Sequence, residues 1–93
     1  MTSTNPHLAV VPAYNEAETI ASVVHTLQEQ TSGFDVLVVD DGSTDDTGIL
    51  ATEAGARVLR LPFNVGIGGA VQAGFTFAPV SYTHLTLPTT PYV

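Results

Sequence analysis

One stretch of the sequence, residues 36–47, constrains the fold more than any other. It begins with four apolar residues, Val36 to Val39, and then reaches two adjacent carboxylates, Asp40 and Asp41, followed by Gly42. A short apolar run bounded by turn signals is typical of a strand buried on both faces of a sheet. In an open parallel sheet, ligands bind just beyond the carboxyl ends of the strands. The stretch therefore predicts two acids at the ligand-binding edge of such a sheet.

On either side of these acids, strand patterns alternate with helix patterns. Strands are expected at His7–Val11, ended by Pro12, at Phe34–Val39 and at Arg57–Leu61. Helices are expected from Asn15 to about Gln30, from Ser43 to near Gly55 and from Gly66 to Ala78. Connections of this length make the strands parallel, with right-handed crossovers. The order predicts an α/β fold with a parallel sheet, one half of a doubly wound sheet.

The expected helix boundaries depend on capping signals. Asn15 is a good N-cap, and Glu18 three positions later completes a pattern like a capping box. Ser43 followed by Asp46 is a second such pattern, and Gly55 is typical of the residue just after a helix end. We therefore expect Asn15 and Ser43 to satisfy the first backbone N–H groups of their own helices.

Charge and composition narrow the function classes. The chain has 93 residues, a formal net charge of −7, no lysine and no cysteine, with Arg57 and Arg60 as its only fixed cations. A partner bound through a basic patch, nucleic acid above all, is therefore not expected, and neither are disulfides or thiolate metal sites. Residues 1–6 lack the features of a signal peptide, and no apolar run is long enough to span a membrane. These features predict a cytoplasmic protein.

The composition changes from Pro79 onward. Residues 79–93 are rich in proline and threonine and contain no acid and no fixed cation. The stretch from Ser81 to Thr89 resembles the translated read-through of a sequencing adapter, which recurs at the ends of fragmentary proteins. We therefore expect a domain over residues 1–78 and an artefactual or disordered tail over residues 79–93.

The first motif that could carry chemistry is Pro12-Ala-Tyr-Asn-Glu16, at the end of the first expected strand. Pro12 fixes the direction of the chain, Tyr14 can stack on a flat ring, and Glu16 can accept hydrogen bonds from hydroxyl groups. Alone, the motif is best explained as a strand-to-helix turn. Its spacing from the Asp40–Asp41 pair is that of one βαβ unit, which favours a ligand site.

Three interpretations are open for Asp40 and Asp41. The pair can serve turn and cap chemistry alone. It can bind Mg²⁺ or Mn²⁺, although the spacing does not fit a calcium loop and no histidine stands nearby in the sequence. It can also recognise a nucleotide, with a carboxylate accepting a hydrogen bond from a base N–H or a ribose hydroxyl.

A glycine-rich segment opens the third expected helix. Gly66-x-Gly68 looks like the start of a dinucleotide fingerprint, but the position of the third glycine holds Val71 and the motif follows the third strand. A phosphate-binding P-loop is excluded because there is no lysine. Each glycine in a helix costs about 1 kcal/mol relative to alanine. Close approach of the backbone to a ligand or a neighbouring element is therefore expected here.

These motifs together resemble a known family. They are Pro12-Ala-Tyr-Asn-Glu16, Val38-Val-Asp-Asp-Gly-Ser-Thr-Asp-Asp-Thr47 and Asn64-x-Gly66 with the following Gly68-Gly-Ala70. Over roughly Leu8 to Ala78, the chain looks like a family 2 glycosyltransferase, with the closest likeness to the dolichyl-phosphate mannose synthase-like branch. The resemblance implies a Rossmann-like parallel sheet, the N-terminal nucleotide-binding half of a GT-A fold.

The same resemblance implies a function. Pro12, Tyr14 and Glu16 would line the nucleotide of a nucleotide-diphospho-sugar donor. One or both of Asp40 and Asp41 would contact the base or ribose, with Val39 beside them. The parent enzyme would transfer the sugar, with inversion, to an acceptor hydroxyl or to a polyprenyl-phosphate lipid at the cytoplasmic face of a membrane.

The sequence departs from the family pattern after the glycine-rich segment. The family's metal-binding Asp-x-Asp and its catalytic base follow the next strand, whereas here no acid occurs after Glu53. A divalent cation, Mg²⁺ or Mn²⁺, is expected in the parent to stabilise the diphosphate leaving group, and no ligand for it is identified in this chain. We therefore expect an N-terminal fragment that is inactive alone and assign it no catalytic residue.

Two other classes of protein share parts of the pattern. A receiver domain of signalling proteins also carries an acid pair after a strand, but it needs a later phospho-accepting Asp and a Lys. A nicotinamide-dependent oxidoreductase needs the missing third glycine. A non-catalytic nucleotide-binding α/β module remains an alternative for the chain itself.

Topology predicts how the two acidic motifs meet. A right-handed βαβ crossover places the first two strands side by side, and both motifs leave at their carboxyl ends. Tyr14, Glu16 and the acid pair should then surround one nucleotide pocket. Successive side chains of a strand point to opposite sides, so one carboxylate should face the pocket while the other supports the turn. We assign the ligand contact to Asp41.

Overall fold

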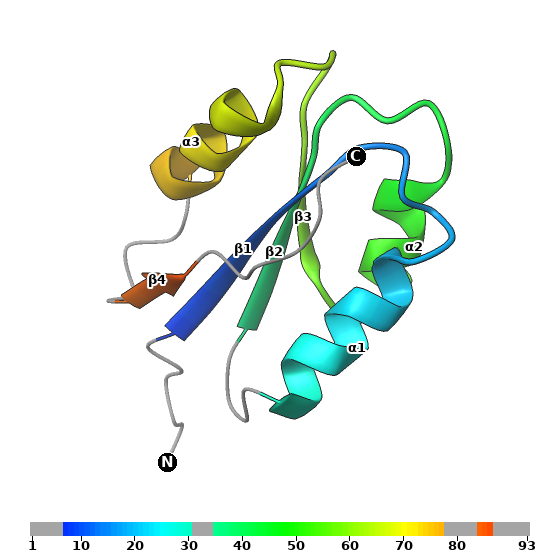
Figure 1. The fold of residues 1–93 in the computed structure, drawn as a ribbon, viewed down its shortest axis with the longest axis vertical. Helices are drawn as coiled ribbons and strands as arrows, with labels where there is room; N and C mark the ends of the chain where they lie inside the picture. The colour runs from blue at the N-terminus through cyan, green and yellow to red at the C-terminus, as the bar shows by residue number, and fades with distance from the viewer. Residues whose placement is uncertain (1–6, 31–34, 78–83, 87–93) are drawn as a thin grey trace.

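The computed structural model describes residues 7–30, 35–77 and 84–86. The strands are β1 (His7–Ala13), β2 (Asp35–Asp40), β3 (Arg57–Arg60) and β4 (His84–Thr86). The helices are α1 (Ile20–Gln30), α2 (Thr47–Glu53) and α3 (Ile67–Phe77). The strands form one parallel sheet in the order β3-β2-β1-β4, which confirms the predicted α/β class. Figure 1 shows α1 and α2 on one face of the sheet and α3 on the other.

The sheet is buried on both faces, as the apolar run of β2 predicts. Val36 and Val38 belong to the core beneath α1 and α2, while Leu37 and Val39 belong to the core beneath α3. This alternation follows from the two-residue period of a strand. The two cores together hold the acidic end of β2 in a fixed place.

Pro12 does not end β1, contrary to the expectation from sequence. The strand continues to Ala13, and Pro12 lies opposite Val39 in the parallel register. The carbonyl of Ala13 accepts a hydrogen bond from the backbone N–H of Asp41 at 2.8 Å, so Ala13 turns its polar groups toward β2. The neighbouring Pro12 must then face away from β2. Its missing N–H therefore removes no bond of the β1–β2 ladder.

The expected N-cap of α1 is wrong. Asn15 lies five residues before the helix and has a left-handed φ of +51°, and its side chain bonds to the turn after β2. The chain first passes through a turn in which the N–H groups of Thr19 and Ile20 both donate to the carbonyl of Glu16. Asn15 does have the hydrogen-bonding groups that make it a common N-cap. Its partner, however, is the turn after β2 and not the helix that follows it.

The start of α2 also differs from the expectation, whereas its end agrees. Asp46 occupies the N-cap position without a side-chain cap, and Asp45 instead accepts from the N–H of Thr47 at 3.0 Å. Ser43 is not a cap of this helix. At the other end, Gly55 has φ +101°, and the N–H groups of Gly55 and Ala56 donate to the carbonyls of Thr52 and Ala51. This is a Schellman arrangement, so the predicted glycine end of the helix is confirmed.

The glycines of α3 serve different purposes. A Cβ atom at Gly74 would lie 2.6 Å from Val10 Cγ1 and 2.9 Å from Val39 Cγ2, so this glycine lets the helix approach the sheet. Gly66, just before the helix, has φ +90°, and Gly68 faces open space. The predicted close approach is therefore found at Gly74, one of the helix glycines, and not at Gly68.

The short strand β4 belongs to the region that we separate as a tail. It pairs in parallel with His7–Ala9 of β1. The rest of residues 79–93 lies outside the described residues, as do Phe34 and Ala78, and the division at residue 78 stays a prediction. Within the described residues, no helix has the length and apolar character needed to cross a membrane.

Candidate functional site

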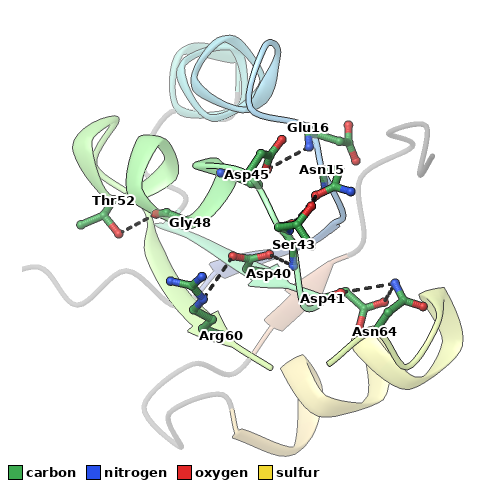
Figure 2. A network of polar contacts seen from close by, with 12 residues as sticks. Asn15, Glu16, Asp40, Asp41, Ser43, Asp45, Gly48, Thr52, Arg60 and Asn64 are labelled. Carbon is green, nitrogen blue, oxygen red and sulfur yellow. Dashed lines mark hydrogen bonds and ion pairs between the residues drawn. The ribbon is translucent and has the colours of Figure 1, made fainter. Parts of the chain in front are cut away.

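Hydrogen bonds join the turn after β1 to the turn after β2. The N–H of Asn15 donates to Ser43 Oγ at 2.9 Å, and Asn15 Oδ1 accepts from the N–H of Thr44 at 2.8 Å. The N–H of Glu16 donates to Thr47 Oγ1 at 2.9 Å. The two motifs therefore lie at one edge of the sheet, as the topology predicted (Figure 2). The left-handed conformation of Asn15 is stabilised by these contacts on both its backbone and its side chain.

Glu16 lies in a cavity beside this junction. The cavity measures about 380 Å³ and is lined by residues 15–19 and by Asp45. Glu16 Oε2 is buried and has no hydrogen-bond partner among the described residues. Burial raises the pKa of the Glu16 carboxyl above its ordinary value, the charge of Asp45 adds to this rise, and a backbone hydrogen bond from Tyr14 opposes it. The Glu16 carboxyl thus belongs to the lining of the cavity, where a carboxylate can accept a hydrogen bond from a bound molecule.

Asp45 shows the opposite behaviour. Its Oδ1 accepts hydrogen bonds from the N–H and the hydroxyl of Thr47, and its Oδ2 accepts from the N–H of Ala17 at 3.2 Å. These bonds, that from the Thr47 hydroxyl first, lower the pKa of Asp45 below its ordinary value. Asp45 therefore remains charged at the wall of the cavity, where it repels a second negative charge on Glu16.

Asp40 is completely buried at the end of β2. Its Oδ1 accepts from the N–H of Ser43 at 3.1 Å, and its backbone carbonyl accepts from Gly42 and Leu61 at 2.9 Å each. Within the part of the chain that the structure describes, its Oδ2 has no hydrogen-bond partner, and it lies 3.9 Å from Arg60 Nε. Asp40 therefore holds the tight turn that presents Ser43 to Asn15.

Asp41 is also completely buried, but it holds a different segment. Its Oδ1 accepts from the N–H of Val65 at 2.8 Å, and its Oδ2 accepts from the N–H of Gly66 at 3.0 Å and from Asn64 Nδ2 at 3.1 Å. Figure 2 shows Asp41 directed toward Asn64, on the other side of β2 from Arg60. Both carboxylates support turns, not one as we expected, and a ligand contact of Asp41 stays a prediction.

The remaining residues of the expected site lie at the same edge. Pro12 and Val39 are buried and opposite each other in the register of β1 and β2, while Tyr14 is half-buried just beyond β1. Of the six expected residues only Glu16 lines the cavity. The roles of Pro12, Tyr14, Val39, Asp40 and Asp41 toward a ligand are therefore predictions that the geometry alone does not test.

Sequence reasoning missed the residues that join the turns. Ser43, Asp45 and Thr47 accept from the backbone of residues 15–17, and Asn64 donates to Asp41. Ser43 was interpreted as a helix-start residue because Ser, Thr and Asp are common there. The number of polar residues in this motif could have revealed their role, because the motif supplies more capping side chains than the short helix α2 needs.

The described part of the chain does not fit the divalent metal expected in the parent enzyme. Within it, no three His, Asp or Glu side chains are placed to hold a metal ion together. Asp40 and Asp41, the strongest candidates, direct oxygens at backbone N–H groups of the neighbouring turns. We therefore derive no chemical step through a metal from these residues.

Known proteins resemble this chain in sequence as well as in fold. Polyprenol monophosphomannose synthase of Mycolicibacterium smegmatis is 36% identical over 74 residues, 73% of this chain and 28% of that protein. Undecaprenyl-phosphate mannosyltransferase of Micrococcus luteus is 40% identical over 73 residues, 73% of this chain and 30% of that protein. The chain thus spans less than a third of the length of these relatives.

A solved structure is also similar to this chain. Glucosyl-3-phosphoglycerate synthase of Mycobacterium tuberculosis, in complex with Mn²⁺, UDP-glucose and phosphoglyceric acid, superposes with a TM-score of 0.68 at 33% identity. The match covers 81% of this chain and 30% of that one. Residues 8–82 also match the family described as Glycosyl transferase family 2. The fold, the paired turns and this match over most of the sequence agree, and the chain belongs to glycosyltransferase family 2.

Proposed function

We propose that this chain binds the nucleotide of a nucleotide-diphospho-sugar donor, as the N-terminal part of a glycosyltransferase. The observation that carries the proposal is the junction of the two turns beside the Glu16 cavity, at the carboxyl edge of a parallel sheet. Ligands of open α/β sheets bind at that edge. The relative from M. tuberculosis, in which the match covers 30% of the chain, was crystallised with UDP-glucose.

Individual residues would contribute in different ways. Tyr14 would stack on the base, and the Glu16 carboxylate, which lines the cavity, would accept a hydrogen bond from a ribose hydroxyl. Pro12 and Val39 would form the apolar floor between the two turns. Asp40 or Asp41 would contact the base or ribose, in addition to holding the turns that they support in the structure.

The complete enzyme would transfer the sugar to an acceptor hydroxyl or to a lipid phosphate with inversion at the sugar carbon. Relatives named for polyprenol and undecaprenyl phosphate favour a lipid acceptor, whereas the synthase from M. tuberculosis is named for phosphoglycerate. The Mg²⁺ or Mn²⁺ would be held by residues other than those described here. The catalytic base would lie outside this chain as well.

Calorimetric titration of the 93-residue chain with UDP, GDP and NAD tests the proposal. We expect one nucleoside diphosphate to bind and NAD not to bind. Glu16→Gln should weaken that binding by about tenfold, because a hydrogen bond to a charged acceptor contributes roughly 1.5 kcal/mol or more. Glu29→Gln is the matched control, because it removes the same charge from an exposed position near the other end of α1.

Two results would contradict the proposal. One is a chain that binds neither UDP nor GDP although its circular dichroism shows a folded α/β protein. The other is an equal loss of affinity in the Glu16 and Glu29 variants, which would show that the loss is not specific to the Glu16 cavity. Preference for NAD would favour the oxidoreductase class that the missing third glycine argues against.

A further inference from the structure

Arg60 is the cation next to the buried acid of the site. It ends β3, directly opposite Asp40 in the parallel register, and its Nε lies 3.9 Å from Asp40 Oδ2. The Arg60 side chain is 63% exposed, whereas that of Asp40 is fully buried. Figure 2 shows the guanidinium directed at the Asp40 carboxylate from the side opposite Asn64.

The Asp40 carboxylate has a specific need for this cation. Its Oδ2 is buried without a hydrogen-bond partner in residues 7–30, 35–77 and 84–86, and a Cβ atom on Gly48 would lie 2.8 Å from it. The first turn of α2 therefore packs against that oxygen and excludes other groups from it. A buried carboxylate oxygen without a partner is costly, and an adjacent positive charge offsets part of this cost.

A chain of contacts leads from this carboxylate to the proposed nucleotide site. Asp40 Oδ1 accepts from the N–H of Ser43 at 3.1 Å, which sets the direction of the Ser43 side chain. Ser43 Oγ in turn accepts from the N–H of Asn15 at 2.9 Å. Asn15 is the residue with φ +51° that precedes Glu16, so its conformation sets where the cavity carboxylate lies.

We propose that Arg60 is a positioning residue for the nucleotide site and acts through Asp40 and Ser43. The inference rests on the proposed function, because it names a residue that tunes the same site without touching the ligand. Arg60 stabilises the orientation of the Asp40 carboxylate, Asp40 fixes the Ser43 turn, and Ser43 holds Asn15. Its exposed position limits the size of the effect, since exposed ion pairs are screened by solvent.

Amide hydrogen exchange and nucleotide titration by NMR test this inference on the complete chain. We expect Arg60→Gln to speed exchange of the Asn15 amide roughly tenfold, because local opening of the turn becomes easier. Affinity for UDP or GDP, whichever the wild type binds, should fall by about three- to tenfold. The corresponding nucleoside, uridine or guanosine, should lose affinity by the same factor, because positioning does not depend on the phosphates.

Three further variants separate positioning through Ser43 from direct phosphate contact and from a net-charge effect. Arg60→Lys keeps the charge and should restore most of the affinity. Arg57→Gln is the matched control at the opposite end of β3, in register with Leu37, and should leave Asn15 exchange unchanged. In a Ser43→Ala background, Arg60→Gln should have little additional effect, because the contact that transmits it is already lost. Urea unfolding of each variant checks that the fold is retained.

Several outcomes would overturn the inference. Unchanged Asn15 exchange in Arg60→Gln would remove the link through Ser43. Loss of affinity for the diphosphate but not for its nucleoside would show that Arg60 contacts phosphate directly. An equal effect of Arg57→Gln would mean that the change in net charge alone explains the result. A wild-type chain that binds neither UDP nor GDP contradicts the proposed function, whereas a wild type that binds and an Arg60→Gln variant that binds equally overturn this inference alone.

Discussion

At the scale of single residues, Glu16 and Asp45 form a pair of carboxylates with opposite pKa shifts. Burial raises the pKa of Glu16, while hydrogen bonds from Thr47 lower that of Asp45. Asp45 therefore stabilises the fold above its unfolded pKa, and this contribution is lost as the pH falls through its lowered pKa. Glu16 acts in reverse, since ionisation of its carboxyl disfavours the folded state as the pH rises from 4.5 through its raised pKa.

The raised pKa of Glu16 predicts a pH dependence of binding. An ionised Glu16 accepts a hydrogen bond from the ligand, whereas a protonated one loses acceptor strength. Affinity for the nucleoside diphosphate should therefore decrease as the pH falls through the raised pKa, at a higher pH than an ordinary glutamate would give. Titrations across the acidic range check this. In Glu16→Gln this part of the pH dependence should disappear, and its persistence would assign the effect to another group.

Several residue-level features of the site could be predicted from sequence. The position of Asp40 and Asp41 at the end of a buried strand follows from the apolar run before them. Which backbone groups the Asp41 oxygens accept from could not be predicted, because Val65 and Gly66 lie more than twenty positions away in the sequence. The cap signals at Asn15 and Ser43 failed for the same reason, since local patterns do not reveal a distant partner for a polar side chain.

At the scale of elements, the approach of α3 to the sheet depends on one glycine. Gly74→Ala places a methyl group 2.6 Å from Val10 Cγ1, so the helix must move away from the sheet. We expect a loss of about 1–3 kcal/mol in the free energy of unfolding, as for other overpacked cores. Gly68→Ala lies in the same helix but faces open space, and it should stabilise the chain by up to about 1 kcal/mol.

Urea unfolding of both variants gives the comparison. The two substitutions share their effect on helix propensity, so a difference in sign isolates the contact with Val10 and Val39. Equal stabilisation by both would mean that α3 does not pack against the sheet as described.

Most of the elements were predictable because each carries its own periodicity. The apolar run of β2 and the glycine end of α2 identify these elements without reference to the rest of the chain. Pro12 was misinterpreted as the end of β1 because its effect depends on which side of the strand it faces, and that is decided by the pairing with β2. Which of Gly74 and Gly68 lies against the sheet likewise could not be predicted without knowing where the sheet lies.

At the scale of the whole molecule, charge opposes the proposed ligand. The chain carries a net charge of −7, and Glu16, Glu18 and Asp45 line the cavity. A nucleoside diphosphate is an anion and is repelled by this field. Raising the ionic strength should therefore tighten binding, by roughly two- to fivefold between about 0.01 M and 0.3 M salt as the screening length shortens.

Titrations of the diphosphate and of its uncharged nucleoside at several salt concentrations check this prediction. The nucleoside should show little dependence on salt, which makes it the control. Weaker binding of the diphosphate at high salt would instead point to cationic groups in direct contact with its phosphates.

The position of Pro12 also affects how the chain behaves toward other copies of itself. Its ring faces away from β2, on the side of β1 where, among the described residues, β4 pairs with residues 7–9. An extended segment from another molecule that tried to lengthen this pairing would meet no N–H at that point. At the opposite edge of the described sheet, the strand β3 carries Arg57 and Arg60 and is followed by Pro62. Proline and charge at these two places disfavour strand-to-strand aggregation, so a Pro12→Val substitution would raise the tendency of the chain to form fibrils.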